Sequence, residues 1–277
     1  KQRNKLIMNA LYGEGNKDPD DIGKGVADLY GIAEKGFDII SNQFSTHYFF
    51  KNKQTLLEFV KNLSENCKVG GYIIGTCYDG EKIFDILKDK QPNESVNQTN
   101  NDGKVIWKMT KKYEGNKLLY DETSLGLEID IYQESINKVH TEFIVVFKYF
   151  TKILELYGFE PCPQEELGRI GLKHPIGSFS ELFDLMNNDL IEGKFQKKNI
   201  GSATDMSDPE KFVSFLNNYY IYKKKKHVNI QTVENSLNHV TDPITREERD
   251  LESSILDESI KTYRDYVIKY NRKVELK

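Results

Sequence analysis

The chain has 277 residues, of which 38% are hydrophobic, 12% aromatic and 30% charged. This length suits one large domain or two small ones, and the aromatic content argues against wholesale disorder. No apolar run approaches the roughly 18 residues that cross a bilayer, which excludes an integral membrane protein. The net charge of −4 gives no overall positive field, so any contact with nucleic acid must be local.

Three cysteines, Cys67, Cys77 and Cys162, are too few and too scattered to predict a disulfide framework or a zinc site. They fit a reducing, intracellular setting. The chain begins with Lys1 and shows no apolar core of a signal peptide. We therefore expect a segment of a longer polypeptide.

The first third of the chain predicts a βαβ unit. A short helix at 5–11 leads into a glycine-rich loop, and a β-branched strand follows at 37–42. Apolar residues at helical spacing predict a helix at 53–63, before a second apolar strand at 72–77 and a helix at 81–87. Continuous apolar strands joined by a helix are typical of a parallel sheet in an α/β fold.

The middle of the chain opens with a polar, Asn-rich stretch at 90–104, which predicts a surface loop. The later elements are strands at 105–109 and 125–132, an apolar run at 143–147, helices at 149–157 and 178–190, and an aromatic run at 215–222.

The tail from residue 228 has a different character. Thr245 and Glu248 form a capping box, and apolar residues then recur at three- and four-residue steps. This pattern predicts a charged amphipathic helix that docks its apolar stripe on something else. We expect residues 1–227 to form one domain and residues 228–277 a charged helical tail.

An unusual cluster follows the first buried strand: Gln43, Phe44, His47 and Tyr48. In open α/β sheets ligands bind beyond the carboxyl ends of the strands. Aromatic rings can stack on a nucleobase, while the amide and the imidazole can form hydrogen bonds with it. The alternative is that Phe44 and Tyr48 cover the end of the sheet and His47 is an ordinary surface histidine.

Three further signals are weaker. The basic run at 223–226 either contacts the phosphates of RNA or is a solvated strand end. Acidic residues at 18–21 lack the rest of a calcium loop and indicate an exposed turn. Cys77 ends a strand and is better explained as a small buried hydrophobe than as a nucleophile.

The segment QFSTHYFF at 43–50, followed by GGYIIGT at 70–76 and then Asp79, resembles the mRNA cap guanine-N7 methyltransferases. Further stretches resemble the forms found in capping enzymes of large DNA viruses; they lie at 12–18, 129–138 and 215–223. The resemblance covers roughly residues 7–225. It implies the C-terminal part of a Rossmann-like class I methyltransferase sheet with added antiparallel strands and helices.

The resemblance also implies roles for single residues. Gln43 and Phe44 would lie beside the methionyl end of S-adenosyl-L-methionine, with Phe44 also touching the guanine. His47 and Tyr48 would line the cap-guanine pocket, and Glu142 would accept hydrogen bonds from the N1 and N2 edge of the base. Tyr132 occupies the place of an aromatic strand residue of the family.

The chain departs from the family pattern in three places. Tyr78 stands where cellular relatives carry Pro, and Asn217 stands where they carry a guanine-contacting Tyr. The Asp-x-Gly-x-Gly turn that holds the methionyl group is missing, and Gly13 and Gly15 do not replace it because no strand precedes them. We expect that turn to lie upstream in the parent chain.

The function that the resemblance implies is methyl transfer from S-adenosyl-L-methionine to guanine N7, by positioning alone, with no catalytic base and no metal. Capped RNA would be the substrate, and fused or associated triphosphatase and guanylyltransferase domains would be partners. The location would be the cytoplasm, a viral factory or the virion. The alternatives are a methyltransferase of another substrate, or a truncated, non-catalytic module that binds capped RNA or a partner subunit.

Overall fold

The computed structural model describes residues 2–239. The chain divides into two compact units, Lys1–Val228 and Asn229–Lys277, and the described part of the second unit holds helix α10 (Ile230–His239). The predicted capping box at 245–248 and the stripe beyond it lie outside the described residues. No helix in the described part of the chain is long and apolar enough to cross a membrane.

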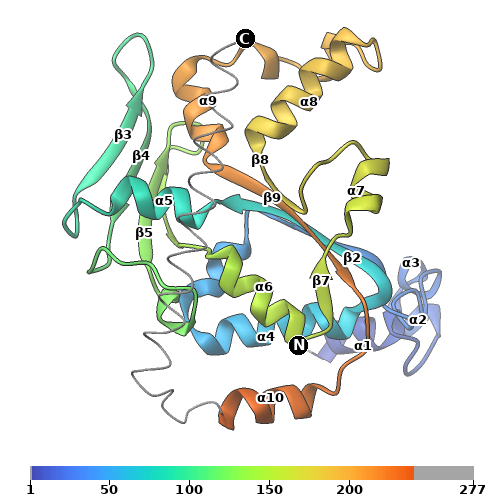
Figure 1. Cartoon of the computed structure of the whole chain (residues 1–277). Coiled ribbons are helices and arrows are strands. Elements are labelled where there is room, and N and C mark those ends of the chain that lie inside the picture. Colours follow the sequence, from blue (N-terminus) through green and yellow to red (C-terminus); the bar gives the residue numbers. More distant parts are fainter. Residues whose placement is uncertain (1, 240–277) are drawn as a thin grey trace. The chain divides into compact units, whose positions relative to one another are not determined.

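The main sheet of the first unit has the strand order β1-β2-β9-β7, with β8 pairing to β9 (Figure 1). β1 and β2 are parallel, whereas β9 runs antiparallel to both β2 and β7. The parallel strands alternate with helices, so the predicted α/β class and the Rossmann-like sheet are confirmed. The strands are β1 (Phe37–Gln43), β2 (Cys67–Tyr78), β7 (Phe159–Pro161), β8 (Ile176–Ser178) and β9 (Asn217–Lys224).

Helices α4 (Lys53–Asn66) and α6 (Phe147–Leu156) build the core on one face of this sheet. The Phe150 ring of α6 packs against Tyr220 and Tyr222 of β9, with centroids 5.9 Å away in both cases. Gly75 lies opposite Tyr220, and a Cβ there would come 2.2 Å from the Tyr220 hydroxyl. Only glycine therefore allows the two central strands to pack here.

A second, antiparallel sheet has the order β3-β4-β5-β6. The apolar residues of β4 and β5 alternate, so that Trp107, Met109, Ile129 and Ile131 are buried on one face. The prediction of a loop over 90–104 is wrong in part, because β3 lies within it and pairs with β4 through its backbone. The strands are β3 (Ser95–Thr99), β4 (Val105–Lys111), β5 (Glu128–Gln133) and β6 (Lys138–Phe143).

Helix α5 leads from β2 of the main sheet to β3 of the second sheet. Gly80 begins α5 directly against the backbone of Val145, where a Cβ would come 2.2 Å from the carbonyl oxygen. The α-helices are α1 (Gln2–Leu11), α2 (Pro19–Ile22), α3 (Lys24–Ala27), α5 (Gly80–Leu87), α7 (Gln164–Arg169), α8 (Phe179–Ile191) and α9 (Asp208–Phe215), and the 3₁₀ turns are η1 (Thr46–Lys51), η2 (Glu122–Ser124), η3 (Lys197–Asn199) and η4 (Ala203–Asp205).

Strand β1 is an open edge of the main sheet. It pairs with β2 on one side, and no strand among the described residues pairs with its other side. The prediction that this strand is buried is wrong in part, because Phe37 and Ile39 retain 40% and 58% of their accessible surface while Ile40 is half-buried. Parallel sheets are normally covered on both faces, so the exposed side chains of β1 are unusual. The unpaired side of β1 also leaves backbone N–H and C=O groups free to pair with another strand.

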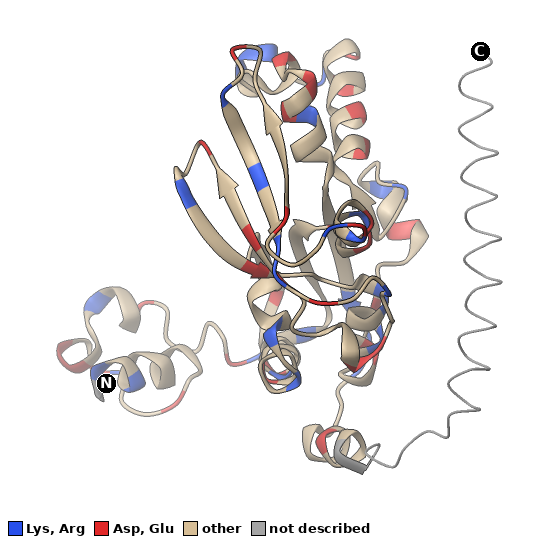
Figure 2. Ribbon diagram, turned by 90° about the vertical axis from the view of Figure 1, so that its left-hand side faces the viewer, with Lys and Arg blue, Asp and Glu red and all other residues tan. Residues whose placement is uncertain are grey.

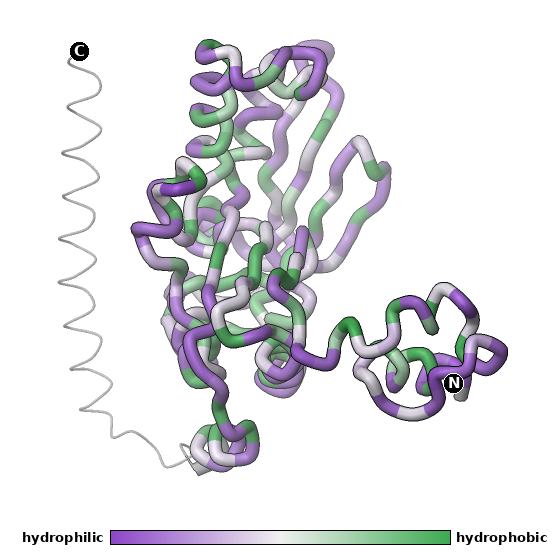
Figure 3. The backbone as a smooth tube through the Cα atoms, turned by 90° about the vertical axis from the view of Figure 1, so that its right-hand side faces the viewer, coloured by the Kyte–Doolittle hydropathy of each residue, from purple (hydrophilic) through white to green (hydrophobic). Residues whose placement is uncertain are grey.

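Charged residues of both signs are spread over the elements of the fold (Figure 2), and hydrophobic and hydrophilic residues alternate along them (Figure 3). Part of the basic run at 223–226 is engaged inside the protein. Lys223 pairs with Glu166 at 2.5 Å, and the buried Lys224 ammonium donates to the Ser64 carbonyl. These two lysines are therefore neither a solvated strand end nor a surface for phosphates.

Candidate active site

The cluster predicted after the first strand is held by a rigid turn. The Asn42 amide donates to the Thr46 hydroxyl at 2.9 Å and to the Tyr220 hydroxyl at 3.2 Å. Phe44 has a φ of 49°, a left-handed conformation that costs energy for a residue with a side chain. Its backbone N–H donates to the Thr76 carbonyl at 2.8 Å, which holds this conformation in place.

His47 and Glu142 meet although they are far apart in the sequence. His47 lies on η1 and Glu142 on β6, and the distance from Nδ1 to Oε2 is 3.4 Å. Both side chains are largely buried, with 7% and 14% of their surface exposed. The ring of Tyr48 packs on that of His47 at a centroid distance of 4.2 Å. The structure thus gathers the predicted imidazole, phenol and carboxylate in one place.

Burial disfavours charge on both members of this pair. It lowers the pKa of His47 to about 4 and raises the pKa of Glu142 to about 7. At neutral pH the imidazole is therefore uncharged and the carboxyl group is near the midpoint of its titration. Because His47 Nε2 is buried without a hydrogen-bond partner among the described residues, the site has unused hydrogen-bonding capacity.

These groups open into a cavity of about 620 Å³, a volume in the usual range for small-molecule sites. It lies where the ends of β2 and β9 approach the inner face of the second sheet, and its wall combines aromatic rings with three carboxylates, Glu134, Glu142 and Glu210. The lining residues are Phe44, His47, Tyr48, Cys77, Tyr78, Ile106, Trp107, Gln133, Glu134, Ser135, Ile136, His140, Glu142, Phe179, Glu210, Val213, Ser214 and Asn217.

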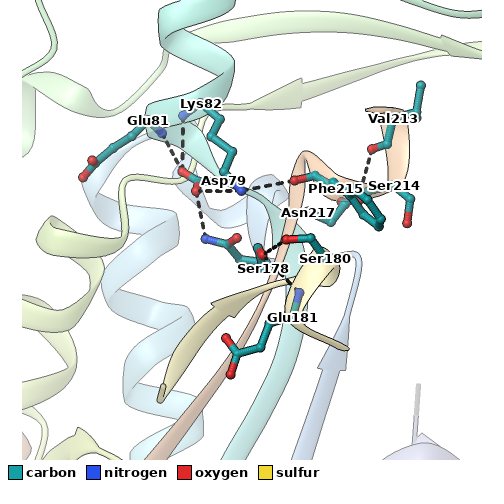
Figure 4. Close-up of polar contacts among 11 residues, drawn as sticks. Asp79, Glu81, Lys82, Ser178, Ser180, Glu181, Val213, Ser214, Phe215 and Asn217 are labelled. Carbon is teal, nitrogen blue, oxygen red and sulfur yellow. Dashed lines mark hydrogen bonds and ion pairs between the residues drawn. The ribbon is translucent and has the colours of Figure 1, made fainter. Parts of the chain in front are cut away.

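Asp79 connects α5 to β9 by hydrogen bonds next to the cavity (Figure 4). One carboxylate oxygen caps α5 by accepting from the backbone N–H groups of Glu81 at 3.0 Å and Lys82 at 3.3 Å. The other oxygen accepts from the Asn218 amide at 3.0 Å, while Lys82 donates to the Phe215 carbonyl at 3.1 Å. This network fixes the beginning of β9 against α5 and the end of α9.

Asn217 begins β9 beside this network and forms part of the cavity wall. Its amide nitrogen donates to the carbonyls of Val213 at 3.3 Å and Ser214 at 3.1 Å, as Figure 4 shows. The residue that replaces a family Tyr is thus anchored to α9, so its amide nitrogen is already committed to the backbone.

Helix α8 brings another aromatic ring to the cavity. The Ser178 hydroxyl accepts from the Glu181 backbone N–H at 3.4 Å and lies 2.5 Å from the Ser180 hydroxyl, also visible in Figure 4. Phe179, next in the chain, packs edge-on against Phe44 at a centroid distance of 6.1 Å. The two rings form one wall of the cavity near the end of β1.

Three residues discussed in the sequence analysis take no part in the proposed chemistry, and the interpretations of Cys77 as a buried residue and of Asp18 as part of an exposed turn agree with the structure. Cys77 is buried, and burial raises its pKa well above the usual value, so the thiol stays protonated and is no nucleophile. Tyr132 pairs in register with Val139 and does not line the cavity. Asp18 caps α2. No group of three metal-ligating side chains gathers among the residues described.

Several wall residues were not singled out by the sequence analysis. Trp107 and Gln133 are direct partners in the β4–β5 register, and Ile131 pairs with His140 in the β5–β6 register. All four share the inner face of the second sheet with Glu142, and three of them, Trp107, Gln133 and His140, line the cavity. Strand alternation could have placed them there, had the strand at 138–143 been predicted.

Comparison with known proteins identifies the family of the chain. Residues 5–225 match the model of the mRNA (guanine-N(7))-methyltransferase domain. The chain belongs to this family, as the sequence motifs indicated.

A probable mRNA-capping enzyme of Acanthamoeba polyphaga mimivirus is 26% identical over 242 residues, which cover 81% of this chain and 20% of that protein. The mRNA cap guanine-N(7) methyltransferase of Saccharomyces cerevisiae is 30% identical over 132 residues, 46% of this chain and 29% of that protein. The chain thus spans less than a third of either relative. A crystal structure of a S-adenosylmethionine-dependent methyltransferase from Clostridium acetobutylicum aligns with a TM-score of 0.37 and 14% identity, covering 69% of this chain and 60% of that chain.

Proposed function

We propose that this chain is the guanine-binding part of an mRNA cap guanine-N7 methyltransferase. The observation that carries the proposal is the buried contact between Glu142 and His47 in a cavity walled by aromatic rings. A carboxylate in such a place needs hydrogen-bond donors, because an unpaired buried charge is costly. The N1–H and N2–H groups of guanine supply two donors on one edge of the base.

The proposed reaction depends on how the guanine base is positioned and does not require proton transfer by the protein. Guanine N7 already carries a lone pair, so methylation requires no general base. The residues of this chain would hold the base so that N7 faces the methyl group in line, at about 3–3.5 Å. The methylated base is positively charged, and the Glu142 carboxylate together with the Phe44 and Tyr48 rings would stabilise that charge.

The proposed cofactor, S-adenosyl-L-methionine, supplies the methyl group as a sulfonium when it is bound. The described residues fit only one wall of its site, namely Gln43 and Phe44 at the carboxyl end of β1. Gly13 and Gly15 both have positive φ, but they follow helix α1 rather than a strand. They do not form the strand–turn cradle that such a group needs, so residues 2–239 do not complete this site.

A second candidate function is a module that binds capped RNA without catalysis. The open edge of β1 and the exposed Phe44 favour it, since the methyl-donor side of the cavity is bare. In either case capped RNA is the proposed ligand. The match covers only 20% of the viral capping enzyme, which is consistent with fused or associated triphosphatase and guanylyltransferase domains as partners. We propose the cytoplasm, a viral factory or the virion as the location, because that relative is viral.

The chain contains one natural reporter for the test. Trp107 is its only tryptophan and lines the cavity, so a stacked or neighbouring base will quench its fluorescence. We expect the unmethylated cap dinucleotide GpppA to quench this fluorescence saturably, and ApppA to do so far more weakly. Equal binding of the two dinucleotides would contradict guanine recognition.

Catalysis is tested separately. The chain is mixed with GpppA and labelled S-adenosyl-L-methionine, and ultraviolet cross-linking of the labelled cofactor is measured alongside methyl transfer. Cap binding without cross-linking or transfer would support the non-catalytic alternative for this chain. Cap binding with transfer would support the enzyme.

A further inference from the structure

Tyr78 occupies a central place that the proposed function does not yet use. It is the last residue of β2, directly before the Asp79 cap, and it lines the cavity. Its side chain reaches out of the main sheet to the inner face of the second sheet, the same face that carries Glu142. The Glu142 carboxylate is close enough to contribute to raising the pKa of the Tyr78 phenol.

Two donors hold the Tyr78 hydroxyl. The Trp107 indole N–H donates to its oxygen at 3.1 Å, and the Gln133 amide nitrogen donates to the same oxygen at 3.1 Å. Trp107 and Gln133 are opposite each other on β4 and β5, so they form a fork around the phenol oxygen. This fork joins the two sheets at the wall of the cavity and fixes where the hydroxyl lies.

The Tyr78 hydroxyl can still donate one hydrogen bond. A phenol oxygen can accept two hydrogen bonds and donate one, and both accepted bonds are taken by the fork. No acceptor for the hydrogen appears among the described residues. Burial raises the pKa of Tyr78 to about 12, so this hydrogen is present throughout the physiological range.

We propose that Tyr78 is a specificity-determining residue whose hydroxyl donates a hydrogen bond to the carbonyl oxygen of the bound guanine. The inference rests on the proposed function and adds a donor to the acceptor that Glu142 supplies. Guanine presents its 6-oxo group directly beside N1–H, so a donor and a carboxylate on one sheet face match that edge. Adenine presents an amino group at the same position, which the Tyr78 hydrogen would oppose.

The test compares two ligands by Trp107 fluorescence: GpppA, and the same dinucleotide with 6-thioguanine as the capping base. Sulfur is the weaker acceptor, so we expect the unchanged chain to prefer oxygen by about 3- to 10-fold, the usual range for one neutral hydrogen bond. Tyr78→Phe should weaken GpppA binding by a similar factor. It should also reduce the preference for oxygen to less than about 2-fold, because no hydroxyl remains to distinguish the two atoms.

Gln133→Met is the matched control. It removes one arm of the fork but leaves the Tyr78 hydroxyl, so the preference for oxygen should persist. An urea unfolding curve of each variant confirms that the compared proteins are folded. A Tyr78→Phe chain that binds GpppA and keeps the full preference for oxygen would overturn the inference, as would equal weakening for both ligands. If the unchanged chain binds no cap, the proposed function fails as well.

Discussion

The two ends of the cavity differ in how completely this chain builds them. At one end Glu142, His47 and the Tyr78 fork are enclosed by two sheets and held by hydrogen bonds. At the other end Phe44 follows the last residue of β1 and keeps 54% of its surface exposed, while Gln43, that last residue, does not line the cavity. The first end is organised before any ligand arrives, whereas the second has a wall on one side only.

This difference separates the two halves of a methyl-transfer reaction. Under the proposed function, recognition of the guanine would depend on groups that this chain already holds in place, so it would need little reorganisation. Recognition of the methyl donor would depend on further groups that the described residues do not supply. Cap binding and donor binding should therefore respond to different mutations, and the following predictions test that separation.

The largest effect is expected from Glu142→Ala. This substitution removes the carboxylate that would accept hydrogen bonds from the N1–H and N2–H groups of guanine. A hydrogen bond to a charged group is worth about 1.5–3 kcal/mol, so losing two of them should lower GpppA affinity at least about 100-fold. Trp107 quenching measures the loss. Glu134→Ala removes another carboxylate of the lining, one that pairs with Lys104, and serves as the control. An equal loss in both variants would show that overall charge, and not Glu142, binds the cap.

A smaller effect is expected from pH. The raised pKa of Glu142, about 7, means that the carboxylate forms as pH rises through neutrality. If only the carboxylate binds guanine, affinity should increase about tenfold from pH 6 to pH 8. His47, with its pKa lowered to about 4, stays uncharged over this range and adds no slope. The same titration of Glu142→Gln should be flat, and a slope that persists in this variant would assign the titration to another group.

Tyr48→Ala should have a moderate effect. Loss of its ring removes an aromatic wall next to His47, which is worth about 0.5–1.5 kcal/mol and corresponds to a 2- to 10-fold loss of cap affinity. The methylated cap should lose more affinity than GpppA, because its base is a cation that the ring attracts. Competition between the two caps measures the ratio of their affinities. If Tyr48→Ala leaves this ratio unchanged, the Tyr48 ring does not contact the methylated base.

Gln43→Ala should have the smallest effect on cap binding, less than about twofold, since its side chain is exposed at the donor end and bonds only to neighbouring hydroxyls. Binding of S-adenosyl-L-methionine, measured by cross-linking, should respond more strongly to this change. A large loss of cap affinity in this variant would show that the two ends of the cavity are not separable.

Much of the main sheet follows from local sequence. The β-branched run at 37–42 and the helical spacing of apolar residues at 53–63 are clear local signals, and both elements form where predicted. The polar strand β3 could not be predicted in this way, since Ser95, Asn97 and Gln98 have low strand propensity. This strand exists because β4 offers it backbone partners, which is a tertiary effect.

Site residues could be predicted from the sequence only where they belong to a family motif. The family motif led to His47 and Glu142, and their contact in space agrees with that expectation, while their roles in binding stay proposals. The fork around Tyr78 depends on the register between β4 and β5 and on where the second sheet meets β2. Neither is encoded in a local pattern, so the sequence showed Tyr78 only as a departure from the family.

The open edge of β1 also has a practical consequence for work with the protein. A strand that presents unpaired backbone groups and an exposed Ile39 is a template for another strand. At high concentration we expect two copies to join edge to edge, so sedimentation should show a dimer that dissociates on dilution. The substitution Ile39→Lys should keep the protein monomeric, because a charged side chain on an edge strand opposes pairing with a second copy. The variant should then be easier to purify and crystallise.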